Sequence, residues 1–553
     1  MSGNRDIEFS NLDRQSRLSK FIDTEFDLIV VGGGITGCGI VLDASLRGLK
    51  TLLLEKKDYA SGTSSKSTKL IHGGLRYLKQ LEFGLVRETG TERAVAHANI
   101  PHLVHPESML LPIVKGGTFS SLSANIAISV YDGLAGVKPK DRKKNLNYSK
   151  TLNLVPQLNK EILKSGIKYS EYRTDDARLC IELVKAARRN GAESFNYMEV
   201  IGFETAAGKI NQVNCHDLIS GTDVKLKTRH VINASGPWAD KVRSFGETKK
   251  QQALHLTKGV HIVVNKSDFP LQMATYFDAF DGRMIFAIPR EQIVYIGTSD
   301  TTFKKDKEKV FCSAEDADYL LDATNKMFPS LNLTKDKIRS SWAGLRPLIQ
   351  KEGKGPTELS RKDEIFVSDV GLITIAGGKL TGFRKMAERS VDMVCKREAQ
   401  FAGRECKTKE YKIHADSFND YESYQTWADE IIKAHAYIDP NTIWYLINNY
   451  GKHAKGIIEK AIFEKDKSLD ESILLNELLY TIHFESVSST LDFFERRTGM
   501  LYFNIERVKS GLELVLNELA KQFHWDAAHI ERERSKTQEV IDMVSLKHLR
   551  KSN

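Results

Sequence analysis

Residues 26–55 read FDLIVVGGGITGCGIVLDASLRGLKTLLLE, and this stretch decides the fold. Its first six residues form an apolar run with the length and composition of a buried parallel strand. Gly32, Gly34 and Gly37 follow in GxGxxG spacing, and a helical periodicity of apolar residues then continues until Gly48. A second short apolar run comes next. The order of strand, glycine turn, helix and strand predicts a βαβ dinucleotide-binding unit.

Each glycine of this unit has a physical role. Gly32 permits the tight turn, Gly34 lets the backbone approach a pyrophosphate, and Gly37 lets the helix pack closely on the strand. The first turn of the helix contains Ile35 and Thr36. Its free N–H groups and the positive end of the helix dipole would face the phosphates of the dinucleotide.

The second strand ends at Glu55, where an acidic residue binds ribose hydroxyls, and this favours FAD or NAD over NADP. Further on, residues 62–78 read GTSSKSTKLIHGGLRYL. Hydroxyls and cations suit contacts with phosphates and a flavin ring, and paired glycines let the backbone pass close to a flat ring. The sequence therefore predicts a loop that completes a flavin site.

Residues 63–80, TSSKSTKLIHGGLRYLKQ, resemble the signature of the FAD-dependent glycerol-3-phosphate dehydrogenases, in the wider D-amino-acid-oxidase-like flavoprotein superfamily. The resemblance extends from Asp27 to about Trp525. It implies an α/β fold in which a Rossmann-like FAD-binding domain is interleaved with an antiparallel-sheet substrate domain, followed by a C-terminal helical domain. It also implies oxidation of sn-glycerol 3-phosphate to dihydroxyacetone phosphate, with electrons passed to membrane quinone.

The resemblance places the FAD contacts on the glycine turn, the end of the second strand, the loop after it, Val200 and two later segments. One of these is residues 234–238, ASGPW, which end a buried strand. Another is residues 377–381, GGKLT, where strand, glycines and helix repeat the opening order, so that a helix dipole would point at the flavin. The predicted cofactor-binding residues are Gly32, Gly34, Ile35, Thr36, Gly37, Glu55, Lys56, Thr63, Ser64, Ser65, Ser67, Lys69, Leu70, His72, Gly73, Val200, Ala234, Ser235, Gly236, Trp238, Gly378, Lys379, Leu380 and Thr381.

The implied substrate sets the chemistry that the site needs. A dianionic phosphate requires cations, and arginine is favoured because its guanidinium gives paired, charge-assisted hydrogen bonds. The family segments point to Arg76, Tyr77, Arg346, Arg361 and Lys379 as substrate-binding residues. Tyr77 adds a neutral donor, and Lys379 is expected nearer the reacting oxygen.

Removal of the proton from the C2 hydroxyl needs a base with a pKa near neutrality. His72 and His261 fit by residue type and by position in the family motifs, and the sequence does not rank them. Lys379 could also stabilise the developing alkoxide, which would make a discrete base less necessary. The predicted catalytic residues are therefore His72, His261, Lys379 and Arg346, and the flavin carries the redox step.

The chain has 553 residues, enough for two or more domains. Residues 1–24 read as a polar lead-in, and residues 25–404 as the interleaved FAD-binding and substrate domains. The substrate part is expected mainly in residues 79–170 and 240–345. From 405 to 553 the sequence is charged, poor in glycine and helical in period, which predicts a separate helical domain.

Two details of this C-terminal region are predicted from its pattern. The segment Leu491–Arg497 reads as a helix with its apolar residues inward and its charges in solvent. The tail past Asp526 is polar and is expected to fray.

Composition is that of a soluble globular protein, with 41% hydrophobic and 28% charged residues. The formal net charge of +9 is compatible with nucleic acid, anionic lipid or an anionic substrate, but no nucleic-acid motif accompanies it. The six cysteines show neither CxxC nor metal-ligand spacing. They are therefore expected to be reduced, buried thiols, and no metal site is predicted.

No apolar run reaches the roughly 18 residues needed to cross a bilayer, and the N-terminus lacks a signal-peptide core, so a cytoplasmic location is expected. Residues 119–137 form an amphipathic stretch joined to a basic cluster, KPKDRKK, at residues 138–144. This pattern fits a helix on an anionic membrane surface, or a core helix before a solvated loop, of which the second is more common. The resemblance favours peripheral attachment to the inner face of the cell membrane and is compatible with a homodimer.

Three alternatives stay open. An oxygen-using alpha-glycerophosphate oxidase, which produces hydrogen peroxide, shares most of these motifs, but such oxidases carry an inserted segment that is not evident here. An amine or amino-acid oxidase needs one carboxylate clamp and an apolar pocket, so the number of cations counts against it. A flavin-binding module without catalysis is disfavoured because His72, Arg76, Arg346 and Lys379 occur together.

Overall fold

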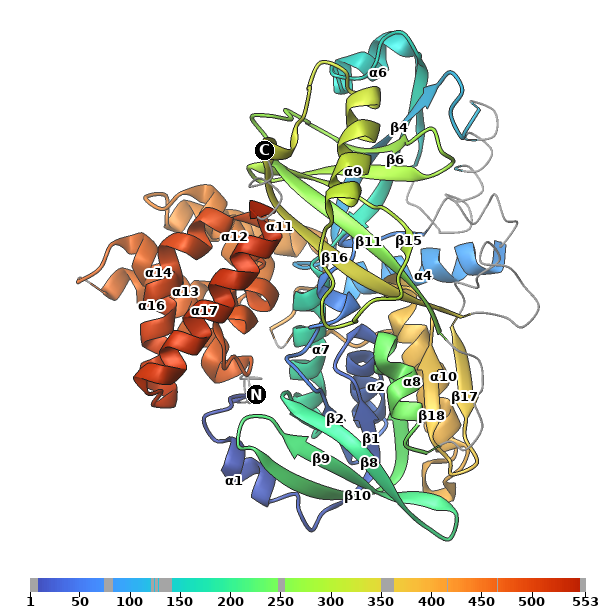
Figure 1. Cartoon of the computed structure of the whole chain (residues 1–553), viewed down its shortest axis with the longest axis vertical. Coiled ribbons are helices and arrows are strands. Elements are labelled where there is room, and N and C mark those ends of the chain that lie inside the picture. Colours follow the sequence, from blue (N-terminus) through green and yellow to red (C-terminus); the bar gives the residue numbers. More distant parts are fainter. Residues whose placement is uncertain are drawn as a thin grey trace.

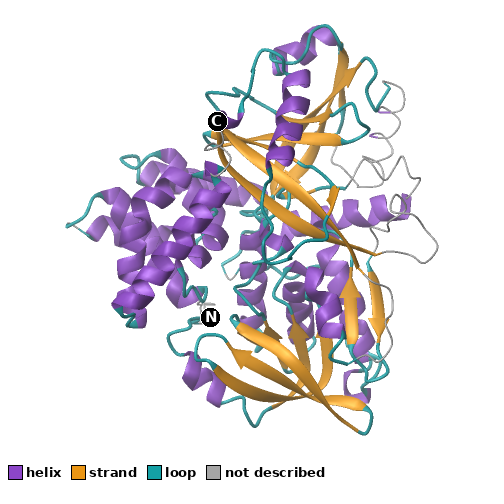
Figure 2. Ribbon diagram, viewed as in Figure 1, coloured by secondary structure: helices purple, strands orange, loops and turns teal. Residues whose placement is uncertain are grey.

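Two β-sheets lie end to end along the molecule, and a bundle of helices packs along one side (Figure 1, Figure 2). The computed structural model describes residues 8–73, 83–120, 124, 128, 142–246, 254–349, 363–414, 416–464 and 466–547. The first sheet occupies the lower part of Figure 1 and the second sheet the upper part.

The first sheet carries the glycine turn. Its strand β1 (Glu25–Val31) is mostly buried and pairs in parallel with β2 (Thr51–Leu54) on one side and β10 (Thr222–Asn233) on the other. Val31 lies opposite the last residue of each neighbour, so the three strands end at the same edge. The other strands of this sheet are β7 (Glu193–Phe195), β18 (Ile373–Ala376) and β17 (Glu364–Val367), with β9 (Lys209–Asp217) and β8 (Met198–Ala206) joined to β10.

Helix α2 (Ile35–Leu46) connects β1 to β2 and packs against α7 (Asp176–Arg189) and α10 (Phe383–Cys395). The predicted βαβ unit is therefore present, and the apolar side chains of α2 are buried on several sides rather than along one stripe. The N-cap of α7 is Asp175, whose carboxylate accepts a hydrogen bond from the Arg178 amide at 3.2 Å.

The second sheet is mostly antiparallel, and its long strands β11 (Leu254–Asn265) and β16 (Ile338–Ile349) pair along their whole length. They run down toward the first sheet in Figure 1. The other strands are β15 (Thr301–Thr302), β14 (Ile293–Gly297), β13 (Met284–Arg290), β12 (Ala274–Asp278), β4 (His105–Val114), β6 (Leu163–Arg173), β3 (Leu70–Ile71) and β5 (Lys144–Leu146). The helices in this part of the chain are α4 (Phe83–Asn99), α6 (Tyr148–Leu154) and α9 (Ala314–Met327).

The C-terminal part of the chain is helical. A side-chain cap begins several of these helices; in α14, Ser468 and Glu471 form a capping box. The helices are α11 (Tyr421–Ala434), α12 (Pro440–Tyr450), α13 (His453–Phe463), α14 (Leu469–Phe484), α15 (Met500–Phe503) and α16 (Ile505–Phe523). Their apolar faces pack on one another in two clusters, one of which continues into the second sheet.

The described part of the N-terminal lead-in and the tail past Asp526 both pack on the rest of the protein. In the N-terminal lead-in, α1 (Arg14–Ser19) is held by a buried ion pair of 2.9 Å between Arg14 and Asp217. The tail forms α17 (Ala527–Val544), capped by the Asp526 side chain. The prediction of a frayed tail is wrong because this helix buries Ile541 in the core and also buries Glu533 and Thr537, two polar side chains that a hydrophobic pattern does not reveal.

The charged side chains of residues 492–497 are also placed differently from the prediction. Asp492–Arg497 forms a π-helix in which every residue is buried. Arg496 and Arg497 both donate to the buried carboxylate of Asp58, at 2.6 Å and 2.7 Å. These charges are therefore in the interior and not in solvent. Their contacts with Asp58 connect the C-terminal helices to the segment after β2.

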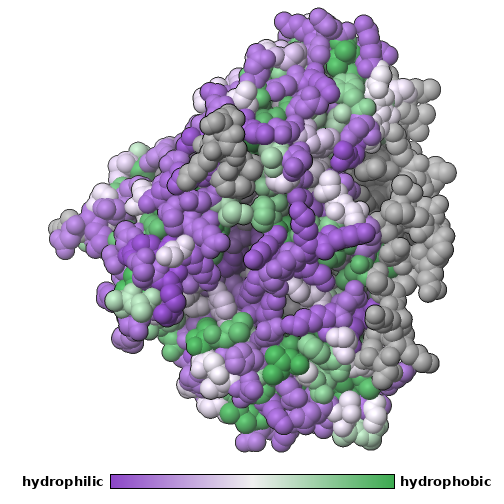
Figure 3. Space-filling view, viewed as in Figure 1, coloured by the Kyte–Doolittle hydropathy of each residue, from purple (hydrophilic) through white to green (hydrophobic). Residues whose placement is uncertain are grey.

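In the described part of the chain, no helix is both long and apolar enough to span a membrane. The face shown in Figure 3 is mostly hydrophilic, with apolar side chains in small groups. The fold is of the α/β class that the sequence predicts, with a largely parallel sheet, a largely antiparallel sheet and C-terminal helices.

Glu477, in α14, is a buried carboxylic acid whose ionisation affects the stability of the fold. It is buried, and Tyr445 donates a hydrogen bond of 2.7 Å to it. Burial raises the pKa of Glu477 from 4.5 to about 7. The unfolded chain therefore ionises at lower pH than the folded one, and this residue's contribution to stability falls as the pH rises between these two values.

Glu477→Gln keeps a hydrogen-bond acceptor but cannot ionise. Its stability relative to the wild type should rise by roughly 1.4 kcal/mol per pH unit across that window and level off above it. Thermal unfolding of both proteins at about pH 5 and about pH 8 measures the change. A difference in unfolding temperature that is the same at both pH values would contradict the assignment.

Candidate functional site

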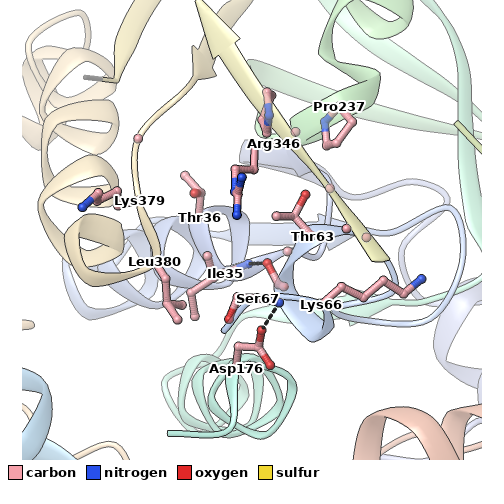
Figure 4. Close-up of a pocket in the computed structure, with 18 of the residues that line it drawn as sticks. Ile35, Thr36, Thr63, Lys66, Ser67, Asp176, Pro237, Arg346, Lys379 and Leu380 are labelled. Carbon is pink, nitrogen blue, oxygen red and sulfur yellow. Dashed lines mark hydrogen bonds between the residues drawn. The ribbon is translucent and has the colours of Figure 1, made fainter. Parts of the chain in front are cut away.

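A cavity opens at the edge of the first sheet where β1, β2, β10 and β18 end, and it continues to the second sheet. Figure 4 shows residues that line it. The structure brings together predicted site residues from most of the chain. Those that line the cavity are Gly32, Gly34, Ile35, Thr36, Glu55, Lys56, Thr63, Ser64, Ser67, Leu70, His72, Val200, Ala234, Ser235, Gly236, Trp238, His261, Arg346, Gly378, Lys379, Leu380 and Thr381.

The glycine turn forms one wall because the backbone passes very close to itself there. Gly32 has a φ of 109°, and a Cβ added to it would lie 2.7 Å from the Ala234 carbonyl oxygen. A Cβ on Gly37 would lie 1.9 Å from the Gly32 carbonyl oxygen. Any side chain at Gly37 would therefore move α2 away from the end of β1.

Glu55 supports this turn from the end of β2. Its carboxylate accepts hydrogen bonds from the Gly33 amide at 2.6 Å and from the Lys57 amide at 2.9 Å. Burial raises the pKa of Glu55, although these two amides act in the opposite direction. The acid expected to bind ribose hydroxyls thus lies beside the glycine turn and lines the cavity.

The hydroxyl-rich loop crosses the cavity next to this wall. Ser64 Oγ accepts a hydrogen bond of 2.9 Å from the Ile35 amide at the start of α2. Thr63 donates a hydrogen bond of 2.6 Å to the Leu345 carbonyl oxygen on β16. The loop is therefore fixed to the start of α2 on one side and to the second sheet on the other.

Four predicted cofactor residues stand behind the lining: Gly37, Ser65, Lys69 and Gly73. Among these four residues, the environment of Lys69 differs most from a cofactor contact. It is buried with a φ of 56°, and its ammonium donates to Asp176 at 2.5 Å and to the Ser65 carbonyl oxygen at 3.2 Å. Its charge is matched by the acidic start of α7, a partner that lies about a hundred residues away and that the loop sequence does not indicate.

A second glycine turn closes the opposite wall. Gly377 and Gly378, after β18, have φ values of 76° and 79°. A Cβ on Gly378 would lie 2.4 Å from the Met386 sulfur, so this turn also packs tightly on its helix, α10. Thr381 donates a hydrogen bond of 3.0 Å to the His72 carbonyl oxygen, which links this turn to the hydroxyl-rich loop.

His261 lies at the end of the cavity nearer the second sheet. Its ring stacks on Trp342, with centroids 4.7 Å apart, and its Nε2 is 3.0 Å from Thr68 Oγ1. Burial, followed by the positive charges of Arg346 and Lys69, holds the pKa of His261 well below its usual range. The imidazole is therefore neutral at physiological pH.

Arg346 extends from β16 into the same region. It forms an ion pair of 3.0 Å with Asp300 and donates a hydrogen bond of 3.1 Å to Thr298 Oγ1. In Figure 4 its guanidinium reaches between Thr36 and Thr63, while Lys379 approaches from the β18–α10 turn with its amine directed away from Arg346.

Some predictions lie outside the described residues: Arg76, Tyr77, Arg361 and most of the stretch 119–141. Conversely, the cavity has lining residues that the sequence did not single out: Thr68, Glu171, Tyr276, Phe286 and Asp300. Tyr276 and Phe286 stack with ring centroids 4.2 Å apart. Asp300 lies in the short segment between β14, which ends at Gly297, and β15, and an acid just after a strand is a signal that could have identified it.

The described residues contain no group of three or more side chains suited to a metal ion. The six cysteines are free, and all but Cys406 are buried, as expected for reduced thiols.

Residues 27–383 match the family described as FAD dependent oxidoreductase, and residues 406–530 match the C-terminal domain of alpha-glycerophosphate oxidase. The chain belongs to the FAD-dependent oxidoreductase family. An aerobic glycerol-3-phosphate dehydrogenase from Staphylococcus haemolyticus is 46% identical to this oxidoreductase over 527 residues, which are 94% of this chain and 95% of that protein. Another from Bacillus subtilis is 44% identical over 549 residues, 98% of each chain.

An X-ray structure of the glycerol-3-phosphate dehydrogenase from Bacillus halodurans, complexed with FAD, is similar to this oxidoreductase with a TM-score of 0.83. The two sequences are 40% identical, and the match covers 97% of this chain and 98% of that one. The resemblance seen in the sequence is thereby confirmed, and the family's cofactor, FAD, is the one predicted.

The cavity of this oxidoreductase fits FAD. Two glycine turns bring backbone to its walls at positions where a Cβ would collide with neighbouring atoms. The start of α2 at Gly34–Thr36 would hold the pyrophosphate, and Glu55 the ribose. Leu380 and Thr381, in the short 3-10 turn that precedes α10, would lie against the flavin.

Gly37→Ala should remove FAD from this oxidoreductase, because the added methyl group would collide with the Gly32 carbonyl oxygen and displace the start of α2. Overpacking of this kind costs roughly 1–3 kcal/mol of stability. Flavin content after purification and thermal unfolding measure both effects.

The matched control is Gly456→Ala in α13, where an added Cβ meets no atom within 4 Å and alanine favours the helix. The control should keep its flavin. A Gly37→Ala protein that purifies with full flavin content and unchanged stability would contradict the geometry of the turn.

Proposed function

We propose that the protein oxidises sn-glycerol 3-phosphate at C2 to dihydroxyacetone phosphate. The observation that carries the proposal is the junction of the two sheets, where His261, His72 and Arg346 line the same cavity as the predicted FAD-binding residues. The relatives named aerobic glycerol-3-phosphate dehydrogenase, which align over nearly the whole chain, support this choice of substrate. FAD, when bound, supplies the acceptor for the hydride from C2.

The phosphate of the substrate would bind Arg346. The guanidinium is held in place by Asp300 and Thr298, and its side chain is about 30% exposed, so it is positioned and also accessible. A guanidinium has five donors, so it can pair with a phosphate while it keeps a bond to Asp300. Asp300 thereby orients Arg346 for the substrate.

The proton of the C2 hydroxyl would pass to an imidazole, and His261 has a geometry suited to this role. Thr68 fixes its ring at Nε2, and stacking on Trp342 fixes the ring plane. The positive charge of Arg346 is one cause of the low pKa of His261. A phosphate paired with Arg346 would offset that charge and so raise the affinity of His261 for the proton.

His72 is the other candidate base. It lines the cavity, its ring meets Phe286 edge-on with centroids 6.0 Å apart, and its backbone is anchored by Thr381. Lys379 lies in the same wall and would stabilise negative charge on the reacting oxygen. Separate pH profiles of kcat/KM for His72→Gln and His261→Gln would identify the base, since loss of the base removes the acid limb of the profile.

Arg346→Ala should raise the KM for glycerol 3-phosphate by about 10- to 100-fold, since a hydrogen bond to a charged group contributes roughly 1.5–3 kcal/mol. Flavin content should not change. Steady-state formation of dihydroxyacetone phosphate with a soluble quinone analogue measures the effect.

The matched control is Arg339→Ala. Arg339 lies on the same strand, but it pairs with Glu506 at 2.6 Å and does not line the cavity. An unchanged KM in Arg346→Ala, or an equal rise in Arg339→Ala, would remove Arg346 from the substrate site.

The electron acceptor that we propose is membrane quinone. A second candidate is oxygen, favoured by the match of residues 406–530 to the C-terminal domain of alpha-glycerophosphate oxidase. Hydrogen peroxide separates the two. A dehydrogenase forms little peroxide in air and turns over with a quinone analogue, whereas an oxidase forms peroxide in proportion to substrate consumed.

A quinone acceptor requires contact with the membrane, and we propose that the protein binds the inner face of the cell membrane peripherally, as a monomer or a homodimer. The exposed edge of β5 and β6 supports this, since Lys144 lies opposite Lys168 and follows the basic residues Arg142 and Lys143. Lysines near an anionic surface contribute about 1 kcal/mol each.

Replacement of Lys143, Lys144 and Lys168 by glutamine should therefore weaken binding to vesicles that contain anionic phospholipid by about 100-fold. The control replaces Lys209, Lys225 and Lys227, which are exposed on β9 and β10 of the other sheet. Sedimentation with vesicles measures both. Equal binding by the two triple variants would show that this edge does not contact lipid.

A further inference from the structure

A loop of the second sheet reaches the end of the cavity that is farther from His261. Residues 303–312 connect β15 to α9, and both ends of this loop are fixed. Phe303 donates its amide to the Leu256 carbonyl oxygen on β11 at 2.9 Å, and a capping box at Ser313 begins α9. The loop is therefore a strap with anchored ends rather than a free segment.

The middle of this loop contains two carboxylates, Asp306 and Glu308, and the first of them shapes the turn that presents the second. Asp306 accepts hydrogen bonds from the amide of Glu308 at 2.9 Å and, through its carbonyl, from the amide of Lys309 at 3.1 Å. This turn directs Glu308 toward the first sheet, where it meets two segments that are separate in the sequence.

Glu308 bridges the two strands that flank β1. Its carboxylate accepts hydrogen bonds from Lys56 Nζ at 2.6 Å and from Trp238 Nε1 at 2.8 Å, and it also pairs with Lys57. Lys56 and Lys57 follow β2, and Trp238 follows β10. The preceding residue of the loop adds a second contact, because Lys307 donates to the Pro237 carbonyl oxygen at 2.8 Å.

These partners form the wall of the cavity at its Glu55 end. Lys56, Lys57 and Trp238 line the cavity, whereas Glu308 lies outside the lining and holds them from behind. The Trp238 ring lies 3.1 Å from the position of a Cβ added to Gly62, so the ring also meets the loop that crosses the cavity. Because Glu55 stands at the ribose position, this end would contain the adenosine of FAD.

Glu308 is a charged carboxylate that is only partly exposed to solvent and has several donors around it. Partial burial opposes ionisation, but hydrogen bonds from Lys56 and Lys57 lower the pKa of Glu308 to about 2. The Lys56 ammonium also lies over the Trp238 ring, 5.3 Å from its centroid. A single exposed ion pair contributes little, but several donors around one carboxylate restrain each other.

We propose that Glu308 is a positioning residue that latches the adenosine end of the FAD cleft, so that cofactor release requires its contacts with Lys56 and Trp238 to break. The inference rests on the placement of FAD in the proposed function and is independent of the substrate. Under this proposal, cofactor retention depends on the second sheet as well as on the βαβ unit of the first sheet.

The test is the rate of FAD release from the intact holoenzyme without substrate. Flavin fluorescence is followed after dilution into buffer with a flavin scavenger. Glu308→Gln, which keeps the shape but removes the charge, should release FAD about five- to tenfold faster than the wild type, and Trp238→Phe should accelerate release less. Higher salt should speed release from the wild type and have little effect on Glu308→Gln.

The control is Glu204→Gln, which removes another exposed glutamate paired with a lysine, Lys225, on β8 and β10 away from the cavity. Its release rate should equal that of the wild type. Equal rates in the wild type and Glu308→Gln, or equal acceleration in Glu204→Gln, would overturn the latch. The release rates are measured without substrate. If glycerol 3-phosphate failed to reduce the bound flavin in a separate assay, that result would refute the proposed function, but the release rates would still test the latch.

Discussion

The contact between the backbones of Gly32, Gly37 and Ala234 is the constraint on which the rest of the structure depends. A Cβ on Gly37 would lie 1.9 Å from a carbonyl oxygen, so α2 can start directly at the end of β1 only if this residue has no side chain. Because β1, β2 and β10 end in register, that helix start faces Glu55 and residues 234–238 at once. The cofactor cleft follows from this single joint, at the carboxyl edge of parallel strands where open α/β sheets bind ligands.

Buried charge then connects this joint to the distant parts of the chain. Asp58, just after β2, accepts hydrogen bonds from Arg496 and Arg497 of the π-helix, and Lys69 is paired with the start of α7. Removing one partner of such a pair leaves an uncompensated buried charge, which is strongly destabilising. The C-terminal helices therefore help to fix the segment from Asp58 to Lys69 that forms one side of the cavity. From the other side, the second sheet fixes it through Thr63 and Leu345.

Local patterns in the sequence predict the dinucleotide-binding unit, and the family resemblance implies the interleaved fold and FAD. The GxGxxG spacing, the acid at Glu55 and the strand lengths each depend on residues close in the chain. What could not be predicted depends on partners far apart in the sequence. Asp58 and Arg497 are separated by 439 positions, so residues 492–497 read as a solvated helix although they are buried. The role of Lys69 and the helix past Asp526 were missed for a similar reason. Lys69 is paired with Asp176, and Thr490 donates to Glu533 of that helix, and both pairs join residues far apart in the sequence.

The central claim is that one cavity places a polyol phosphate against FAD, and its most direct test is anaerobic. Glycerol 3-phosphate is added to the flavin-loaded protein in the absence of oxygen and quinone, and the yellow absorbance of oxidised flavin is followed. The account predicts bleaching in proportion to substrate, recovery on addition of a quinone analogue, and no bleaching by glycerol alone. A flavin that stays oxidised with glycerol 3-phosphate, while dithionite still reduces it, would contradict the account.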